Sequence, residues 1–341
     1  MSDLAAASSL VHTRDGSRLK NRSTPKAGDA AHRFGARALI MPAIAVVLLF
    51  VFLAPILLVI AVSFGEKIEG ASWVWAFDPS NYARVFVGIG WPEQITLLYA
   101  YKLVYTLAYA VLGSLIAIAF AFPFTYFLSQ CSRPVQAGWL VFILASLSMS
   151  EVFIVMGWDI MLSNRSGLPA LFKATGVTEW LKETGWLAVL KDWGLANPRN
   201  VKFKTSQLAT VLTMAYLVWP YAVILLYAPL SRIDRSMIEA ARTMGAGSFT
   251  VMRTVIVPVV RIPVMGTLLL LFVYLLGAYV TVTYFAEPAH QTLPVSIYEA
   301  IRGATLNAPF GAAQAVVLLS TAGVFILASL WLSHLAEKRN R

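Results

Sequence analysis

Two carboxylates stand in an apolar stretch of the chain, where charge is unusual. Glu151 and Asp159 belong to "SMSEVFIVMGWDIM", within a segment from Gly138 to Leu162 that carries no other charge. If this segment spans a membrane, Glu151 lies near mid-membrane, where a carboxylate is costly unless it faces a partner or water. A carboxylate on a transport path suits a cationic solute. The alternatives for Glu151 are a neutral or hydrogen-bonded packing residue, or a place near the outer end of the span.

Tyr274 and Tyr279 are weaker candidates for lining such a path. Tyr284 follows at the same five-residue spacing, so the three tyrosines do not share one helix face. Asp159 lies closer to the outer surface than Glu151, where water can solvate it.

Catalytic and metal-binding constellations are not predicted. The four histidines are scattered (His12, His32, His290 and His334), and the single cysteine, Cys131, forms neither an intramolecular disulfide nor a metal cluster. No carboxylate pair or nucleophile lies at a plausible depth. The phosphate-binding pattern G-x-x-x-x-G-K-[ST] does not occur in the sequence. We therefore expect a protein that is not an enzyme, with no catalytic residue, metal or cofactor of its own.

Long apolar runs must position these residues. The chain is 58% hydrophobic and 13% charged, with a mean hydropathy of +0.70, whereas soluble domains average about 25% charged residues. Several runs exceed the roughly 20 residues that cross a bilayer as a helix. The sequence predicts an all-α polytopic membrane protein with about six transmembrane helices, at 39–64, 103–129, 138–162, 207–230, 262–284 and 311–334.

The first apolar run is too long for the core of a signal peptide, and no small-residue cleavage site follows it, so we expect a retained helix. Residues 1–37 are predicted to be a disordered basic cytoplasmic tail, residues 38–335 a transmembrane domain, and residues 336–341 a basic cytoplasmic end. A long outside stretch, 163–206, carries Trp180, Trp186 and Trp193, which suit a helix on the outer membrane surface or against a partner.

The charge distribution sets the orientation. With both termini inside, the inside segments hold 16 Lys/Arg against 6 Asp/Glu, and the other face holds 11 against 11. The whole net charge of +10 then falls on one side, as the positive-inside rule predicts. The basic excess therefore favours a topology in the lipid bilayer rather than a nucleic-acid partner.

A polar segment, "IEAARTMGAGSFTVMRTVIVPVV" from Ile238 to Val260, falls in the longest inside loop, 231–261. Asp234 can cap a first helix through Met244, and Gly245 can end it in the left-handed conformation. Ser248 can cap a second helix that stops at Pro258. We expect Ile238, Ala241 and Met244 on one docking face for a soluble partner. The alternative is an amphipathic helix lying on lipid.

The same segment resembles the "EAA" loop of the membrane subunits of ABC importers. That pattern is Glu-Ala-Ala, three residues, Gly, nine residues, Ile, one residue, Leu, Pro. Here Glu239, Ala240, Ala241, Gly245 and Pro258 match it, and Val255 and Val257 are conservative departures. "PSNYARVF", "YTLAYAVLGSLIAIAFAFPFTYFLS" and "PLSRIDRSMIEAARTMGA" look like permeases of the polyamine-type (spermidine/putrescine) branch. The resemblance covers 39–335 and is weak over 173–204.

The resemblance implies a type I importer permease in a bacterial inner membrane. Its partners would be a second permease of a different chain, two cytoplasmic ATPase subunits that bind ATP and Mg, and a periplasmic binding protein that delivers the solute. Glu239, Ala240, Ala241, Gly245 and Pro258 would form the loop that docks on the ATPase.

Several functions stay open from the sequence. The cargo is a polyamine or other organic cation, an amino-acid-like compound, ferric ion, or an oxyanion or phosphonate. The second function class is a secondary transporter or channel that works without an ATPase. The two halves of the chain show no matching repeat, which counts against a transporter built from paired repeats.

Overall fold

The computed structural model describes residues 27–68, 73–90, 93–303 and 306–338. The chain divides into two units, one up to Leu58 and one from Val59 onward. The first unit is formed by helix α1 (Ala27–Ser63), whose last residues continue into the second unit. Along its apolar part, from Ile44, side chains such as Phe50 and Phe52 are exposed. An apolar helix with no buried face is typical of contact with lipid or a partner.

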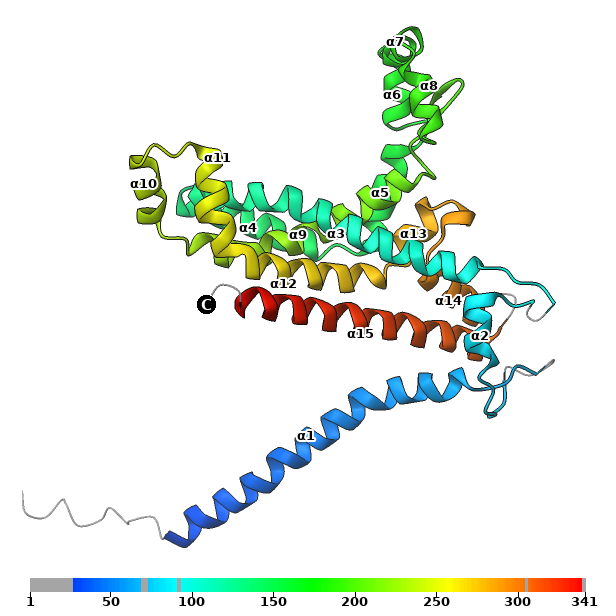
Figure 1. Cartoon of the computed structure of the whole chain (residues 1–341), viewed down its shortest axis with the longest axis vertical. Helices are drawn as coiled ribbons and strands as arrows, with labels where there is room; N and C mark the ends of the chain where they lie inside the picture. The colour runs from blue at the N-terminus through cyan, green and yellow to red at the C-terminus, as the bar shows by residue number, and fades with distance from the viewer. Residues whose placement is uncertain (1–26, 69–72, 91–92, 304–305, 339–341) are drawn as a thin grey trace, which may run out of the picture. The chain divides into compact units, whose positions relative to one another are not determined.

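The second unit holds all other elements, almost all of them helical (Figure 1). They are α2 (Ser80–Val87), α3 (Leu98–Gln130), α4 (Arg133–Leu147), α5 (Glu151–Leu162), α6 (Leu168–Ala174), α7 (Val177–Glu183), α8 (Trp186–Asp192), β1 (Ala196–Asn197), β2 (Asn200–Val201), α9 (Gln207–Ser231), α10 (Arg235–Thr243), α11 (Ser248–Val251), a π-helical turn (Met252–Ile256), α12 (Val257–Leu276), α13 (Val280–Phe285), a 3₁₀ turn (Pro288–His290), α14 (Leu293–Arg302) and α15 (Ala308–Lys338).

Among the described residues, five helices are long and apolar enough to cross a membrane, and a bent pair, α4 and α5, makes a sixth span if it is counted as one. This confirms the predicted all-α membrane architecture and its about six spans. The five run over Ile44–Ser63, Leu98–Gln130, Gln207–Ser231, Ser248–Leu276 and Ala308–Trp331.

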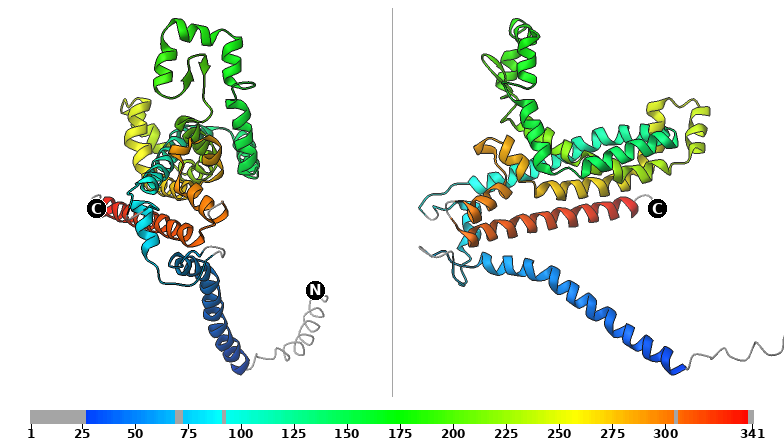
Figure 2. Two further views of the ribbon diagram at one scale, coloured as in Figure 1. Left: turned by 90° about the vertical axis from the view of Figure 1, so that its right-hand side faces the viewer. Right: turned by 180° about the vertical axis from the view of Figure 1, so that it is seen from behind.

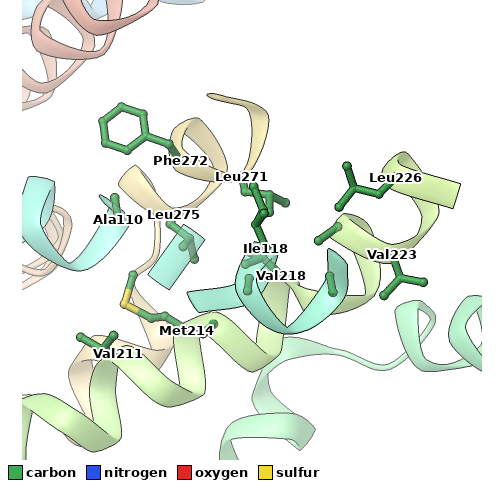
Figure 3. Close-up of a cluster of buried hydrophobic side chains, with 14 of the residues drawn as sticks. Ala110, Ile118, Val211, Met214, Val218, Val223, Leu226, Leu271, Phe272 and Leu275 are labelled. Carbon is green, nitrogen blue, oxygen red and sulfur yellow. The ribbon is translucent and has the colours of Figure 1, made fainter. Parts of the chain in front are cut away.

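The core of the second unit lies where α3, α9 and α12 pack together (Figure 3). Gly113, Ala117 and Ala121 stand at four-residue spacing on α3, and all three are buried. A Cβ on Gly113 would lie 2.9 Å from Leu275 Cδ1. Close approach of this kind increases van der Waals contact between membrane helices, where water supplies no hydrophobic driving force.

The stretch between α5 and α9 folds as a small helical subdomain, which we call the outer subdomain (residues 163–206). Leu187, Ala196 and Val201 form its core. The β1–β2 hairpin is tied to it because Asn200 accepts a hydrogen bond from Thr178 Oγ1 at 3.0 Å. The tryptophans expected at a surface, Trp180, Trp186 and Trp193, are exposed.

Some predicted boundaries differ from the structure. Helix α1 begins at Ala27, before the expected start near residue 39, and the alanine-rich sequence there favours helix. Residues 27–37 are thus helical rather than part of a disordered tail, and residues 1–26 of that tail lie outside the described residues. The basic end is described only to Lys338, within α15.

The predicted helix 262–284 is also divided differently. Helices α11 and α12 join through the π-helical turn into one span, Ser248–Leu276. Gly277 then ends α12, and α13 begins at Val280. The second loop helix was expected to stop at Pro258, which is wrong, because Pro258 stands in the first turn of α12. The π-helical turn before Pro258 changes the hydrogen-bond pattern there, so the helix continues past a residue that has no N–H.

Candidate functional site

A sharp bend between α4 and α5 places Glu151. The two helices meet at 95°, and Glu151 is the first residue of α5. The prediction of one continuous helix over 138–162 is therefore wrong. Near the bend, Ser146 Oγ and Ser148 Oγ donate hydrogen bonds of 2.7 Å to the carbonyls of Ile143 and Ala145. Serine hydroxyls that bond back to the preceding turn compete with a regular helix.

The Glu151 carboxylate is held by the start of a second short helix. Its Oε1 accepts hydrogen bonds from Thr281 Oγ1 at 2.9 Å and from the backbone N–H of Thr281 at 3.3 Å. Thr281 is the second residue of α13 and is fully buried. Glu151 therefore lies in the first turn of its own helix, α5, and accepts hydrogen bonds from the first turn of another, α13. Both settings stabilise a negative charge.

Glu151 lines a cavity of about 440 Å³, which we call the aromatic cavity. Its walls come from α4, α5, α9 and α12, and Glu151 is the one carboxylate among the described residues that line it. Tyr221 and Tyr274 lie with ring centroids 5.5 Å apart. The aromatic residues of its wall are Phe142, Phe153, Trp158, Tyr216, Trp219, Tyr221 and Tyr274.

The structure separates the two tyrosine candidates. Tyr274 lines the aromatic cavity together with Glu151. Tyr279 does not line it, and its ring packs on Tyr298 with centroids 4.6 Å apart. Asp159, eight residues after Glu151 on the same helix, pairs instead with Lys204 at the base of the outer subdomain, at 2.6 Å.

Sequence reasoning missed most of the aromatic wall. Trp219, Pro220 and Tyr221, which are consecutive on α9, all line the cavity. Tyr216 and Trp158 lie with ring centroids 5.5 Å apart. The sequence signal that could have indicated the cavity wall is the spacing of Tyr216, Trp219 and Pro220, which places them at neighbouring positions on one helix face.

A second candidate surface is the loop from Asp234 to Gly247, which we name the coupling loop after the role that the resemblance implies for it. Asp234 caps α10, because its Oδ1 accepts a 2.9 Å hydrogen bond from the backbone N–H of Ser236. That bond is the main reason why the pKa of the Asp234 carboxyl lies below its usual range. Gly245 ends the helix with φ +82°, a conformation that glycine adopts readily. Both predicted roles are confirmed.

The exposed face of the coupling loop differs from the predicted one. Ile238 and Ala241 are both 7% exposed and pack into the core, whereas Met244 is 83% exposed. Glu239 and Ala240 are exposed. The expectation of one docking face with Ile238, Ala241 and Met244 is therefore wrong, because the helix turns its apolar stripe inward.

Two details of the second loop helix also differ. Gly247, not Ser248, occupies the N-cap position of α11, and Ser248 is the first helical residue. Phe249 is 79% exposed, and Met244 is similarly exposed. Helices α10 and α11 lie at one end of the bundle, and α2 and α14 lie at the other (Figures 1 and 2). Within the residues that the structure describes, no group of His, Cys, Asp or Glu could hold a metal.

Comparisons with known proteins agree with this architecture. The chain is 25% identical over 294 residues to the spermidine/putrescine transport system permease protein PotB of Escherichia coli K12, covering 85% of this chain and 95% of that protein. It is 23% identical over 274 residues to PotB of Haemophilus influenzae, covering 80% and 85%. It is 29% identical over 121 residues to PotC of E. coli K12, covering 36% and 45%.

A solved structure of a bacterial alginate ABC transporter, in complex with an alginate-bound periplasmic protein, matches the fold with a TM-score of 0.62 at 13% identity. It covers 89% of this chain and 94% of the matched chain. No family model matches. The resemblance to ABC importer permeases is confirmed. The chain is thus similar over most of its length to permease subunits of ABC importers, and these relatives together with its apolar helices indicate a multi-pass inner-membrane transport protein.

Proposed function

We propose that this permease passes a polyamine or another small organic cation from a periplasmic binding protein to the cytoplasm. The observation that carries the proposal is the position of Glu151, a carboxylate in a cavity walled by tyrosine and tryptophan. Ammonium groups are attracted both to a carboxylate and to the faces of aromatic rings, by about 0.5–2 kcal/mol per ring. A cavity of this composition favours a cation with apolar carbon between its charges.

The same cavity disfavours the other cargoes. An oxyanion or phosphonate would meet the charge of Glu151 and no cation, since none of the described lining residues is Lys or Arg. Ferric ion prefers several oxygen or nitrogen ligands close together, and only one carboxylate is present in the wall. The similarity to proteins named for spermidine and putrescine supports the same cargo class.

ATP hydrolysis on two separate cytoplasmic subunits, which bind ATP and Mg, drives the transport. The coupling loop docks on one of them through its exposed residues, Glu239, Ala240 and Met244. Ala241 is buried beneath these exposed residues and packs into the core, Gly245 turns the chain, and Pro258 lies in the first turn of α12. Met244 and Phe249 are both exposed and supply apolar side chains to this contact, and large apolar side chains that become buried are typical of interface hot spots.

The second permease of the complex is a different chain. The relatives carry two permease names, PotB and PotC, and this chain matches the first over far more of its length. Both termini and the coupling loop lie in the cytoplasm, since the basic residues gather on that side.

Substituting Glu151 tests the cargo assignment. Glu151→Gln removes the charge but keeps the shape, and a hydrogen bond to a charged group contributes about 1.5–3 kcal/mol. Uptake of labelled spermidine or putrescine by the full transporter is expected to fall at least about tenfold, with unchanged co-purification of the ATPase subunits. Glu179→Gln, an exposed carboxylate of the outer subdomain, is the matched control.

Unchanged uptake kinetics in Glu151→Gln would show that the carboxylate does not meet the cargo. Competition by unlabelled amino acids, ferric citrate or phosphonates at least as strong as that by polyamines would contradict the organic-cation assignment. Uptake that continues after removal of the ATPase subunits would favour the secondary transporter.

A further inference from the structure

A second cavity of about 410 Å³ lies between α3, α14 and α15. Helix α14 is at the end of the bundle away from the coupling loop (Figure 1). We call it the polar end cavity. It shares no lining residue with the aromatic cavity. Its polar lining side chains are Lys67, Tyr99, Lys102, Ser296, Glu299, Asn307 and Gln314, and neither the transport path nor the coupling loop uses them.

Lys102 is a buried cation with little local compensation. Its side chain is 8% exposed, and Nζ lies 3.9 Å from Glu299 Oε2 and 5.8 Å from the ring centroid of Tyr99. A hydrogen bond between nitrogen and oxygen is about 2.7–3.2 Å long, so the Glu299 contact is an ion pair without a good hydrogen bond. An ammonium has three donors, and such a group is costly to bury unless they are used.

Gln314 is the second and independent observation. It is fully buried, and among the described residues neither its amide oxygen nor its amide nitrogen has a hydrogen-bond partner. Buried amides are almost always paired. A glutamine in the wall of a polar cavity with both amide atoms unpaired indicates a ligand that accepts one hydrogen bond and donates another.

We propose that the polar end cavity binds a phosphate group that carries a primary amine, as in an aminoethyl phosphate headgroup. The two cations of the wall, Lys67 and Lys102, outnumber its one carboxylate, Glu299, and a phosphate offers several acceptor oxygens to them and to the Gln314 amide nitrogen. The ammonium of the ligand donates to Glu299, which is 56% exposed, and to the Gln314 amide oxygen.

This headgroup has two sources. One is a phosphatidylethanolamine lipid, since the cavity lies at the end of membrane helices and its wall also contains Ile89 and Phe310, against which an acyl chain can lie. The other is a free aminoalkyl phosphate in solution. The recognition chemistry is the same, and the difference is whether the acyl chains add affinity.

Binding is measured on the intact, delipidated transporter in detergent. The probes are dihexanoyl phosphatidylethanolamine, dihexanoyl phosphatidylcholine, free phosphoethanolamine and sodium phosphate, each titrated by native mass spectrometry and by the thermal shift of the complex. The ethanolamine lipid is expected to bind saturably and at least about fivefold more tightly than the choline lipid, because a trimethylammonium cannot donate hydrogen bonds to Glu299.

Equal binding of free phosphoethanolamine and the ethanolamine lipid supports the site and identifies the free source. Much tighter binding of the lipid supports the site and identifies the membrane source. Absence of saturable binding, or equal binding of the ethanolamine and choline lipids, would overturn the proposal and indicate that the cavity holds only water.

Variants locate the site. Gln314→Leu is expected to weaken ethanolamine lipid binding severalfold without lowering the unfolding temperature of the lipid-free complex, because leucine has no unpaired polar atoms. Glu299→Gln is expected to remove the preference for ethanolamine over choline. Lys102→Gln weakens binding of both lipids, and Lys182→Gln, on the exposed surface of the outer subdomain, is the control.

Wild-type binding in both Gln314→Leu and Glu299→Gln would place the lipid elsewhere and contradict the proposal, even if Lys102→Gln fails to fold. Glu151→Gln is expected to bind the ethanolamine lipid as the wild type does, so failure of the cargo assignment and failure of this site give different results.

Discussion

At the scale of single residues, Glu151 shows how a charge is kept in an apolar segment. The helix break exposes backbone N–H groups at the start of α5, and Thr281 supplies two donors from α13. A carboxylate that is held in this way keeps its second oxygen, Oε2, for a ligand. The arrangement therefore positions the side chain and leaves it able to bind.

The contribution of Thr281 can be measured. Thr281→Val removes the 2.9 Å hydrogen bond from Oγ1 and keeps the β-branched shape, so Glu151 becomes less well oriented. We expect the KM for polyamine uptake to rise about threefold to tenfold, which corresponds to about 0.7–1.4 kcal/mol for one hydrogen bond. The control is Thr283→Val, whose Oγ1 donates to the carbonyl of Tyr279 in its own helix. Equal effects of the two variants would contradict the specific role of Thr281.

Glu151 could be predicted from the sequence because an acid in a charge-free run is conspicuous by itself. Its aromatic neighbours could not, because Trp158, Tyr216 and Tyr274 come from three helices, α5, α9 and α12. Aromatic residues are common in membrane helices, and only packing shows which of them face one cavity. Tyr279, the other tyrosine candidate, does not line this cavity, and its ring packs on Tyr298.

At the scale of elements, the coupling loop depends on one left-handed residue. Gly245 has φ +82°, and a Cβ there would meet nothing within 4 Å. Gly245→Ala therefore adds backbone strain of about 1–2 kcal/mol without a steric clash. We expect a lower fraction of ATPase subunits to co-purify with the variant permease.

Gly247→Ala is the matched control for this prediction. Gly247 has an ordinary φ of −68° and equally open space around its Cα. Loss of the ATPase subunits in both variants would indicate a general sensitivity of the loop to side chains, and retention in both would show that the left-handed turn does not matter.

The cap of α10 gives the loop a pH dependence. The folded-state pKa of Asp234 lies below its usual value, first because of the hydrogen bond from the Ser236 backbone N–H. The cap therefore stabilises α10 above the unfolded pKa, near 4, and this stabilisation is lost as pH falls through the folded pKa. We expect amide-exchange protection of α10 (Arg235–Thr243), corrected for intrinsic rates, to decrease below about pH 4.

Asp234→Asn keeps an acceptor oxygen without titrating, so its protection is expected to be independent of pH in this range, whereas Asp234→Ala loses protection at every pH. Identical pH profiles for the wild type and Asp234→Asn would exclude the Asp234 carboxyl as the titrating group.

Most helices could be predicted from their apolar runs and capping residues, because a run of about twenty apolar residues crosses a bilayer almost only as a helix. The bend between α4 and α5 could not be predicted, because "SMS" before Glu151 is only a weak helix breaker. The helix breaks there because α4 and α5 pack separately against α9 and α13. The continuity of α11 with α12 was missed because Pro258 looks like a stop, and the π-helical turn accommodates it.

At the scale of the whole molecule, the fold places the coupling loop and α14 at opposite ends of the bundle. The proposed orientation can be tested by labelling in a Cys131→Ser background, which removes the single cysteine. An impermeant maleimide is expected to label Lys182→Cys, in the outer subdomain, in intact spheroplasts. It is expected to label Thr243→Cys only after permeabilisation. Both positions are exposed, and labelling of both from the same side would contradict the orientation.

The join between α11 and α12 has a mechanical consequence. The span from Ser248 to Leu276 has 29 residues, and at 1.5 Å per residue it is about 43 Å long. One end of this span follows the loop that we propose docks on the ATPase subunit. The other end stops just before α13, whose Thr281 donates hydrogen bonds to Glu151. If the loop docks on the ATPase as proposed, one continuous helical span connects that contact with the start of α13, which holds the Glu151 carboxylate. Under that proposal, a displacement at the ATPase contact changes the position of α13 and therefore the orientation of the carboxylate that we propose meets the cargo.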